Sequence, residues 1–262
     1  MKVTFDSNVW QQVSNPSNYP DDPASACFQK ISEAISTGKI NAYLAETTFT
    51  LEAFKKTDRQ SSLASYSPKI EFTTDEMPNG VIKVGFKIDP DKGAHPGNNS
   101  YLSEYLAKAI PLGFKILHCP RIGGFKNPDI QDEYFARQTE AETHDRNELA
   151  GEVSRAIEAR NAGVSHIKKI GAQYSPDPKD WLKGIRAAPD SEEKAIAKAF
   201  SEWVDGDSVA VHVGYKNTHY CTRDQGKNAG QGSVLAKSNR EWLEQTYGVV
   251  FVTPEELYAL LA

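Results

Sequence analysis

The feature that most constrains the fold is the alternation of short apolar segments with amphipathic ones at both ends of the chain. Near the N-terminus, KVTFD (2–6) and INAYLA (40–45) have the β-branched and aromatic content of strands, and a helical pattern lies between them. Near the C-terminus, HYCTRD (219–224) and VVFV (249–252) flank another helical pattern. Strands that alternate with helices predict a mostly parallel sheet covered on both faces. We therefore expect a three-layer α/β/α fold.

Several helices are predicted by the spacing of apolar residues and by their end signals. One pattern stops at Gly38, a suitable residue for a helix C-terminus. The type of the DSVAVHVGYK segment is left open, because its small and apolar residues suit a buried helix whereas its valines suit a strand. The predicted helices cover residues 25–37, 47–56, 101–110, 191–204, 238–247 and 254–261.

The middle of the chain does not continue the alternation of strand and helix patterns. The segment KIEFTTDEMPNGVIKVGFKIDP alternates on either side of Pro78, Asn79 and Gly80, which predicts a β-hairpin. A polar stretch over 129–171 predicts a long helix with a break at Gly151 or Gly163. FKILHCP (114–120), in the same region, is typical of a buried strand that ends at a proline. Neither end of the chain has enough strands for a domain of its own. We therefore expect one domain over 1–262, formed mainly by 1–56 and 191–262, with 57–190 as an inserted hairpin and helical region.

Composition limits the setting in which the chain works. The three cysteines, Cys27, Cys119 and Cys221, are widely separated and form no disulfide framework, which favours a reducing cytoplasm. The longest apolar segments are only strand-sized, so we expect no membrane span and no membrane partner. A net charge of −5 argues against a broad basic face for polyanions. That objection weakens if acidic residues bind a divalent cation, because the metal reverses the local charge.

Acidic side chains follow or precede several of the predicted strands. In an open parallel sheet, ligands bind beyond the carboxyl ends of the strands. Each acid also has a plain structural explanation, because aspartate is common where a strand turns over and at a helix N-cap. The candidates come from four pieces of the chain: Asp6 after 2–6, Glu46 and Glu52 after 40–45, Asp205 and Asp207 before 219–224, and Asp224 at its end.

Such a group of acids is electrostatically costly unless a cation is present, because like charges a few ångströms apart raise one another's pKa. Oxygen ligands without a Cys/His set favour Mg²⁺ or Mn²⁺ over Zn²⁺. One or two such ions can activate a water molecule and stabilise the leaving oxygen in phosphodiester hydrolysis. The residues therefore indicate a divalent-cation site at one edge of the sheet.

Several motifs, taken in their order, resemble those of PIN-domain ribonucleases. They are VTFDSNVW, AETTFTLEAF, DSVAVHVGYK, and HYCTRDQGK followed by VVFVTPEEL. The resemblance covers roughly 1–56 and 191–262, about half of the chain. Each motif is weak alone, but the late succession of strand, Thr-x-Asp, helix, strand and Thr-Pro-Glu-Glu-Leu is fairly specific. The resemblance implies a PIN-like fold and a metal-dependent endoribonuclease that prefers single-stranded RNA.

The resemblance also assigns roles to individual residues. Asn8 and Thr222 match supporting positions. Glu46 is an alternative to Glu52 as a metal ligand, and Asp205 is an alternative to Asp207. The family includes toxins of bacterial toxin–antitoxin pairs, so an antitoxin protein or a second copy of the chain joins RNA as an expected partner. A typical member is much shorter, which points to a divergent branch whose substrate differs or whose activity is lost. The residues that the resemblance makes catalytic, with Mg or Mn as their cofactor, are Asp6, Glu52, Asp207 and Asp224.

Two other hypotheses about the function stay open. The acidic net charge and the large middle region favour a non-catalytic PIN-fold module that binds nucleic acid or protein. A phosphatase with Asp6 as its nucleophile is the weaker reading, because the DSN segment lacks a second aspartate two residues on.

The remaining polar residues have structural explanations as well. His212 lies among valines and alanine, which is typical of a core histidine, and His118 with Cys119 is expected to pack at the end of a strand. The RIGGFKN loop (121–127) could contact phosphate through Arg121, Lys126 and its glycine amides, but a plain surface turn is the favoured explanation. Arg223 and Lys227 flank Asp224 and suit either a phosphate backbone or solvent.

Overall fold

Five parallel strands form the central sheet, in the order β5-β2-β1-β6-β7. They are β1 (Lys2–Phe5), β2 (Asn41–Ala45), β5 (Lys115–Leu117), β6 (His219–Cys221) and β7 (Phe251–Val252). In this computed structural model, residues 1–65, 69–78, 80–89, 95–119, 125–226, 230 and 232–261 are described, with only the backbone at 86–88. The chain leaves the central strand β1 for β2 on one side, whereas β6 lies on its other side. The carboxyl ends of β1 and β6 therefore meet at the switch point of the sheet, where α/β proteins bind ligands.

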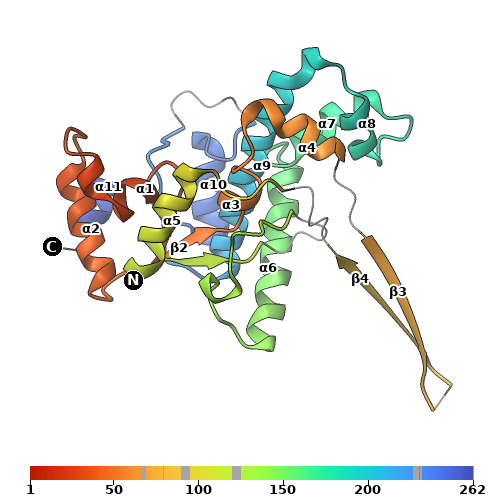
Figure 1. Ribbon diagram of the computed structural model, residues 1–262, viewed down its shortest axis with the longest axis horizontal. Coiled ribbons are helices and arrows are strands. Elements are labelled where there is room, and N and C mark those ends of the chain that lie inside the picture. Colours follow the sequence, from red (N-terminus) through yellow and green to blue (C-terminus); the bar gives the residue numbers. More distant parts are fainter. Residues whose placement is uncertain are drawn as a thin grey trace.

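Helices cover both faces of the sheet, as the alternating pattern predicts (Figure 1). One face packs on α1 (Trp10–Ser14), α2 (Ser25–Ser36), α5 (Ser100–Leu112) and α11 (Pro254–Ala259), through a core that includes Phe5, Leu44, Phe28 and Leu106. The other face packs on α6 (Glu140–Ala159), α9 (Glu193–Gly214) and α10 (Lys237–Tyr247), around Tyr220, Val209 and Leu243. The expected three-layer α/β/α fold is confirmed.

A third apolar cluster joins the first half of α9 to a helical group at one end of the sheet. This group consists of α4 (Arg59–Ser65), α7 (Ser165–Tyr174) and α8 (Trp181–Ala187). Leu63, Ile167, Ile185 and Phe200 are fully or almost fully buried in it. The short α3 (Thr47–Thr50) follows β2, and 3₁₀ turns lie at Pro16–Asn18, Lys56–Asp58, Asp132–Tyr134 and Asp190–Glu192.

Three predicted assignments differ in the structure, and one open choice, the position of a helix break, is decided by it. The helix expected over 47–56 ends at Thr50, so Glu52 lies in the following turns. The predicted helix over 191–204 and the DSVAVHVGYK segment form one continuous helix, because burial outweighs the strand preference of the valines. The break in the polar helical stretch falls at Gly163, with φ of 59°, whereas Gly151 lies inside α6. Finally, β5 comes from the region treated as an insertion, yet it pairs with β2 in the main sheet.

The predicted hairpin is confirmed, and it extends away from the body of the molecule (Figure 1). It consists of β3 (Lys69–Glu76) and β4 (Ile82–Asp89), paired antiparallel. Phe72 is 74% exposed and Val84 is 65% exposed, although both are large apolar residues. The described residues of the hairpin thus present apolar side chains to the surroundings. Within the described part of the chain, no helix combines the length and the apolar character that crossing a membrane requires.

Candidate functional site

Asp6 lies directly beyond β1, at the switch point of the sheet, and its side chain is buried. Its Oδ2 accepts hydrogen bonds from Thr222 Oγ1 at 2.7 Å and from Asn8 Nδ2 at 2.9 Å, and its Oδ1 accepts one from the Ser7 backbone N–H at 2.7 Å. Burial raises the pKa of Asp6, and the charge of Asp224 raises it further, while the Thr222 and Ser7 hydrogen bonds oppose this change. Asp6 is therefore a carboxylate whose negative charge is disfavoured where it lies.

The Thr222 hydroxyl connects the two strands of the switch point. It donates to Asp6 and also accepts from the Asp224 backbone N–H at 3.0 Å and from Asn8 Nδ2 at 3.3 Å. The Asn8 Oδ1 in turn accepts from the Arg223 backbone N–H at 3.1 Å. Asn8 and Thr222 thus fix the segment after β6 against the segment after β1.

Glu52 lies in the turns that follow α3, and its side chain is partly buried. Its Oε2 atom is buried and has no hydrogen-bond partner among the described residues. Burial and then the charge of Asp6 raise the pKa of Glu52 to about 7, although Ser7, Arg59 and Lys56 favour its charged form. A buried carboxylate oxygen without a donor is costly, and a bound cation would relieve that cost.

The two candidate ligands on α9, Asp205 and Asp207, lie in different surroundings. The pKa of Asp205 is raised well above its usual value by burial and by the charges of Asp6, Glu202, Glu52 and Asp224. Asp205 thus shares one electrostatic environment with the acids that follow β1 and β6. Glu202 is one helical turn before it on α9 and joins the same environment.

The preferred ligand of the sequence analysis, Asp207, is placed differently. Its buried Oδ2 accepts a hydrogen bond from Trp203 Nε1 at 2.8 Å. Positions 205 and 207 are separated by about 200° around an α-helix, so they cannot both face the same point. The charges of the acids after β1 and β6 therefore act on Asp205, whereas Asp207 is hydrogen-bonded within its own helix.

Asp224 is exposed in the loop after β6. Its Oδ1 accepts from the Gly226 backbone N–H at 2.7 Å, which is the strand-end turn that aspartate commonly makes. Its charge nevertheless contributes to the raised pKa of both Asp6 and Asp205. Asp224 thus makes a strand-end turn and also acts electrostatically on two of the other acids, which are the two roles that its sequence context suggested.

Glu46 lies at the end of β2, on the side of β5. Its Oε2 accepts from the Cys119 backbone N–H at 3.0 Å and lies 3.6 Å from His118 Nδ1. The His118 ring stacks on Phe135 with centroids 3.8 Å apart, so it packs as expected. Glu46 therefore holds the end of β5 and is not among the charges that act on Asp6, Glu52 or Asp205.

We call Asp6, Glu52, Asp205 and Asp224, with Glu202 beside them, the acidic set. Sequence reasoning missed Glu202, although its position three residues before Asp205 places both on one helix face. Within the described ranges, no three Asp, Glu, His or Cys side chains are grouped closely enough to hold a metal ion. The acidic set therefore has suitable oxygen donors and strong mutual repulsion, but its side chains do not form a closed ligand shell.

The structure describes three of the other residues that the sequence singles out, His212, Arg223 and Lys126. His212 is buried, with Nδ1 2.9 Å from Thr4 Oγ1, and the core role predicted for it is confirmed. Arg223 pairs with Asp22 at 2.7 Å. Lys126 is exposed, whereas Arg121 and Lys227 lie outside the described residues.

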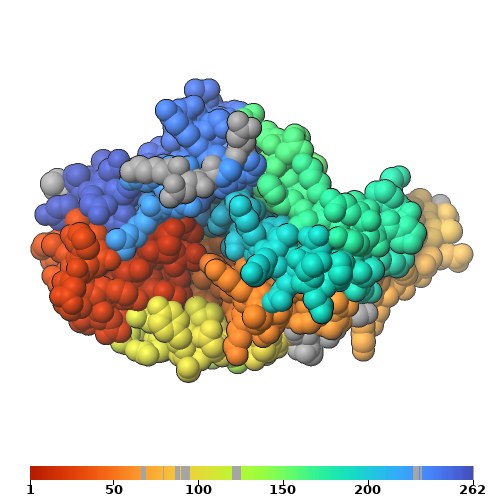
Figure 2. Space-filling view, turned by 90° about the horizontal axis from the view of Figure 1, so that it is seen from above, coloured from red at the N-terminus to blue at the C-terminus, as the bar shows by residue number. Residues whose placement is uncertain are grey.

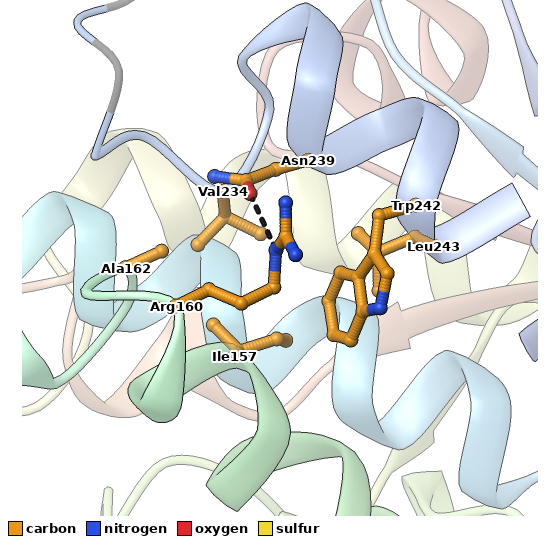
Figure 3. Close-up of a pocket in the computed structure, with 7 residues that line it drawn as sticks. All are labelled: Ile157, Arg160, Ala162, Val234, Asn239, Trp242 and Leu243. Carbon is orange, nitrogen blue, oxygen red and sulfur yellow. Dashed lines mark hydrogen bonds between the residues drawn. The ribbon is translucent and has the colours of Figure 1, made fainter. Parts of the chain in front are cut away.

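A small crevice between α6 and α10 has a structural explanation (Figure 3). Arg160 Nε donates to Asn239 Oδ1 at 2.9 Å, and the guanidinium lies 4.6 Å from the centre of the Trp242 ring. The lining is otherwise apolar and includes no acid: Ile157, Arg160, Ala162, Val234, Asn239, Trp242 and Leu243. This crevice is a packed contact between two helices.

Comparison of the chain with models of protein families, with curated proteins and with solved structures finds no significant match. The likeness to PIN-domain ribonucleases therefore stays a resemblance of motifs, and the function has to be inferred from the acidic set itself.

Proposed function

We propose that the protein is a metal-dependent endoribonuclease that hydrolyses phosphodiester bonds of single-stranded RNA at the acidic set. The observation that carries the proposal is that burial, and then the charges of neighbouring carboxylates, disfavour the ionised forms of acids at the switch point of the sheet. Burial raises the pKa of Glu52 to about 7, with the charge of Asp6 as the second cause. Burial also raises the pKa values of Asp6 and Asp205, and the charge of Asp224 adds to both. Acids with strongly perturbed pKa values are candidates for a functional site, and the switch point of a parallel sheet is where such sites lie.

The donor set suits a hard divalent cation. Asp6, Glu52, Asp205 and Asp224 offer only carboxylate oxygens, and the buried Oε2 of Glu52 lacks a donor. When bound, Mg²⁺ or Mn²⁺ would supply an activated water molecule and stabilise the leaving oxygen. The chain itself orients Asp6 through Thr222 and Asn8, and it supplies Glu202 as a further negative charge beside Asp205.

A second candidate function is a non-catalytic module with the same fold. Its support is the absence of a closed ligand group among the described residues. For the nuclease, the carboxylates have to turn toward a cation as it binds. For the non-catalytic module, they do not bind one at all.

The test is cleavage of a fluorescent single-stranded RNA with Mn²⁺ or Mg²⁺, with EDTA as the metal-free reference. We expect the wild-type protein to cut and Asp6→Asn to lose cutting while it keeps a folded melting transition. The matched control is Asp75→Asn on the exposed hairpin, which removes one carboxylate far from the sheet edge and keeps activity. A contaminating nuclease would cut equally in all three preparations.

Melting curves with and without Mn²⁺ separate the two candidates. A wild-type protein that neither cuts RNA nor gains stability from the cation would overturn the nuclease proposal and favour the non-catalytic module. Stabilisation by Mn²⁺ that disappears in Asp6→Asn would place the cation at the acidic set even before a cleavable sequence is found.

A further inference from the structure

Three tyrosines form a hydrogen-bonded cluster beside the N-terminal segment, and we call Tyr19, Tyr101 and Tyr105 the tyrosine shelf. The Tyr19 and Tyr105 hydroxyls lie 2.8 Å apart, and those of Tyr19 and Tyr101 lie 3.4 Å apart. The rings of Tyr101 and Tyr105 have centroids 4.7 Å apart, and those of Tyr19 and Tyr105 are 6.4 Å apart. The rings and their hydroxyls thus hold one another in fixed orientations.

The tyrosine shelf packs against the core through Tyr105 and is exposed to solvent at Tyr101. Tyr105 is buried and makes an edge contact with Trp10, whose ring contacts Phe49 in the core. Tyr101 is 48% exposed, and its hydroxyl donates to Gln11 Oε1 at 2.9 Å. Packing explains Tyr105 completely, but it does not require a large exposed ring at position 101. A rigid, half-exposed aromatic ring offers binding area at a low cost in conformational entropy.

Two segments of the chain run from residues at or beside the acidic set to residues that contact or carry the tyrosine shelf. The first is α1, which begins where the Asp6 carbonyl accepts the backbone N–H groups of Val9 and Trp10 at 3.0 and 3.2 Å. Because each helical residue advances by only ~1.5 Å, the Gln11 backbone lies within roughly 10 Å of Asp6. Tyr101 therefore donates to a residue that lies only five positions after Asp6 in the chain.

The second segment is the loop that carries Tyr19. Its Asp22 accepts from the Arg223 guanidinium at 2.7 Å, and the Arg223 backbone N–H donates to Asn8. One short loop thus contacts Arg223, the residue before Asp224, at one end and carries a member of the tyrosine shelf at the other. Figure 2 shows the N-terminal segment (red) beside α5 (yellow), with a hollow where they meet the segment after β2 and the first part of α9.

We infer that the tyrosine shelf is a binding subsite on which Tyr101 stacks one base of a single-stranded RNA whose phosphodiester backbone lies at the acidic set. This inference rests on the proposed function, since it names how the same site holds its substrate. Stacking on an aromatic ring suits a protein with net charge −5, because it provides affinity without a basic groove. It also requires an unpaired base, so it selects single strands over duplexes.

The test measures binding without cleavage. A short single-stranded RNA that contains 2-aminopurine is titrated with protein in Ca²⁺, which takes oxygen ligands in place of Mg²⁺ or Mn²⁺, and fluorescence anisotropy, 2-aminopurine quenching and the integrity of the RNA are followed together. We expect Tyr101→Ala to weaken binding by about 5- to 100-fold and to abolish the quenching, since stacking on an aromatic side chain contributes this much per base. Tyr101→Phe keeps the ring and should bind like the wild type. Tyr258→Ala, which removes another half-exposed tyrosine on α11, is the matched control.

Each outcome decides the inference separately from the nuclease proposal. Equal binding by Tyr101→Ala and wild type, or no binding by the wild type, overturns the tyrosine shelf even if the protein cuts RNA. A loss of binding confined to Tyr101→Ala supports the shelf even if no cleavage is ever detected. The same sequence as DNA, and as a duplex, shows whether the subsite distinguishes the sugar or only the unpaired base.

Discussion

The Thr222 hydroxyl donates to the Asp6 carboxylate at 2.7 Å, and this bond joins the ends of β1 and β6. The same hydroxyl accepts from the Asp224 backbone N–H, so one buried oxygen orients two acids from distant parts of the chain. Because the bond stabilises the charged form of Asp6, it keeps a carboxylate available where burial alone would favour the acid.

Thr222→Val should therefore weaken the site without removing any acid. Valine has nearly the same shape but neither donates to Asp6 nor accepts from the Asp224 backbone. We expect metal affinity and RNA cleavage to fall by about 10- to 100-fold, as is usual when a group that orients a metal ligand is lost. Mn²⁺ titration followed by thermal shift measures the first, and the RNA cleavage assay measures the second. Thr222→Ser restores the hydroxyl and should restore both, whereas an unaffected Thr222→Val would contradict an orienting role.

Glu52→Gln should stabilise the metal-free protein at neutral and higher pH. The folded-state pKa of Glu52 is about 7, above the ordinary value of 4.5, so the folded state holds the proton more tightly. Its contribution to stability is complete below pH 4.5 and is lost as the pH rises to about 7 and beyond. The shift corresponds to a cost on the order of 3 kcal/mol above pH 7, which glutamine avoids.

Urea unfolding in EDTA at pH 4, 6 and 8 checks this prediction. The difference between Glu52→Gln and wild type should grow with pH, and a difference that does not change with pH would exclude a raised pKa as its cause. Glu33→Gln, on the exposed surface of α2, is a control for the loss of one charge.

The carboxyl ends of the strands could be predicted from the sequence, and so could the acids that directly follow them. Asp6 and Asp224 are recognisable because each comes at the end of a short segment whose composition is typical of a buried strand. The choice between Asp205 and Asp207 could not be made, because it depends on the continuity of α9. With the helix taken to end at Val204, Asp207 looks like a helix start, whereas in the continuous helix Asp205 shares a face with Glu202. The hydrogen bonds of Thr222 likewise depend on register between strands that are far apart in the chain.

Asp205→Asn and Asp207→Asn should consequently behave differently. A cation at 100 times its Kd stabilises the folded state by about 2.7 kcal/mol, and we expect the wild type and Asp207→Asn to show this gain with Mn²⁺. Asp205→Asn should lose most of it, because it removes a member of the acidic set. The measurement is the thermal shift as a function of Mn²⁺ concentration. If Asp207→Asn lost the stabilisation by Mn²⁺ and Asp205→Asn kept it, Asp207 would be the ligand, as the motif resemblance implies.

The hairpin should be energetically separate from the body of the molecule. Phe72→Ser and Val84→Ser are expected to change the free energy of unfolding by less than about 0.5 kcal/mol, because both side chains are already exposed in the folded state. Phe114→Ala, in the buried core, should cost about 3–5 kcal/mol in the same urea experiment. A loss above about 1.5 kcal/mol in Phe72→Ser would indicate that its apolar surface is covered in solution.

His212 should dominate one part of the acid denaturation of the protein. It lies on α9 and is buried against the sheet, with Thr4 of β1 as its hydrogen-bond partner and Tyr220 against its ring, and burial lowers its pKa to about 3. The unfolded chain takes up a proton near the ordinary value of 6.5, and the folded state does so only near 3. Stability is therefore lost as the pH falls from about 6.5 to 3, by an amount on the order of 4–5 kcal/mol.

The variant His212→Asn tests this loss directly. Asparagine can still hydrogen-bond to Thr4 but takes up no proton, so the stability of the variant should decline less steeply between pH 6.5 and 3, although the smaller side chain lowers it at pH 8. The measurement is urea unfolding at half-unit pH intervals, with His144→Asn on the exposed side of α6 as the control. If His212→Asn and wild type lost stability in parallel over this range, the histidine would not be buried in its neutral form, and the contact between Thr4 and α9 would need another explanation.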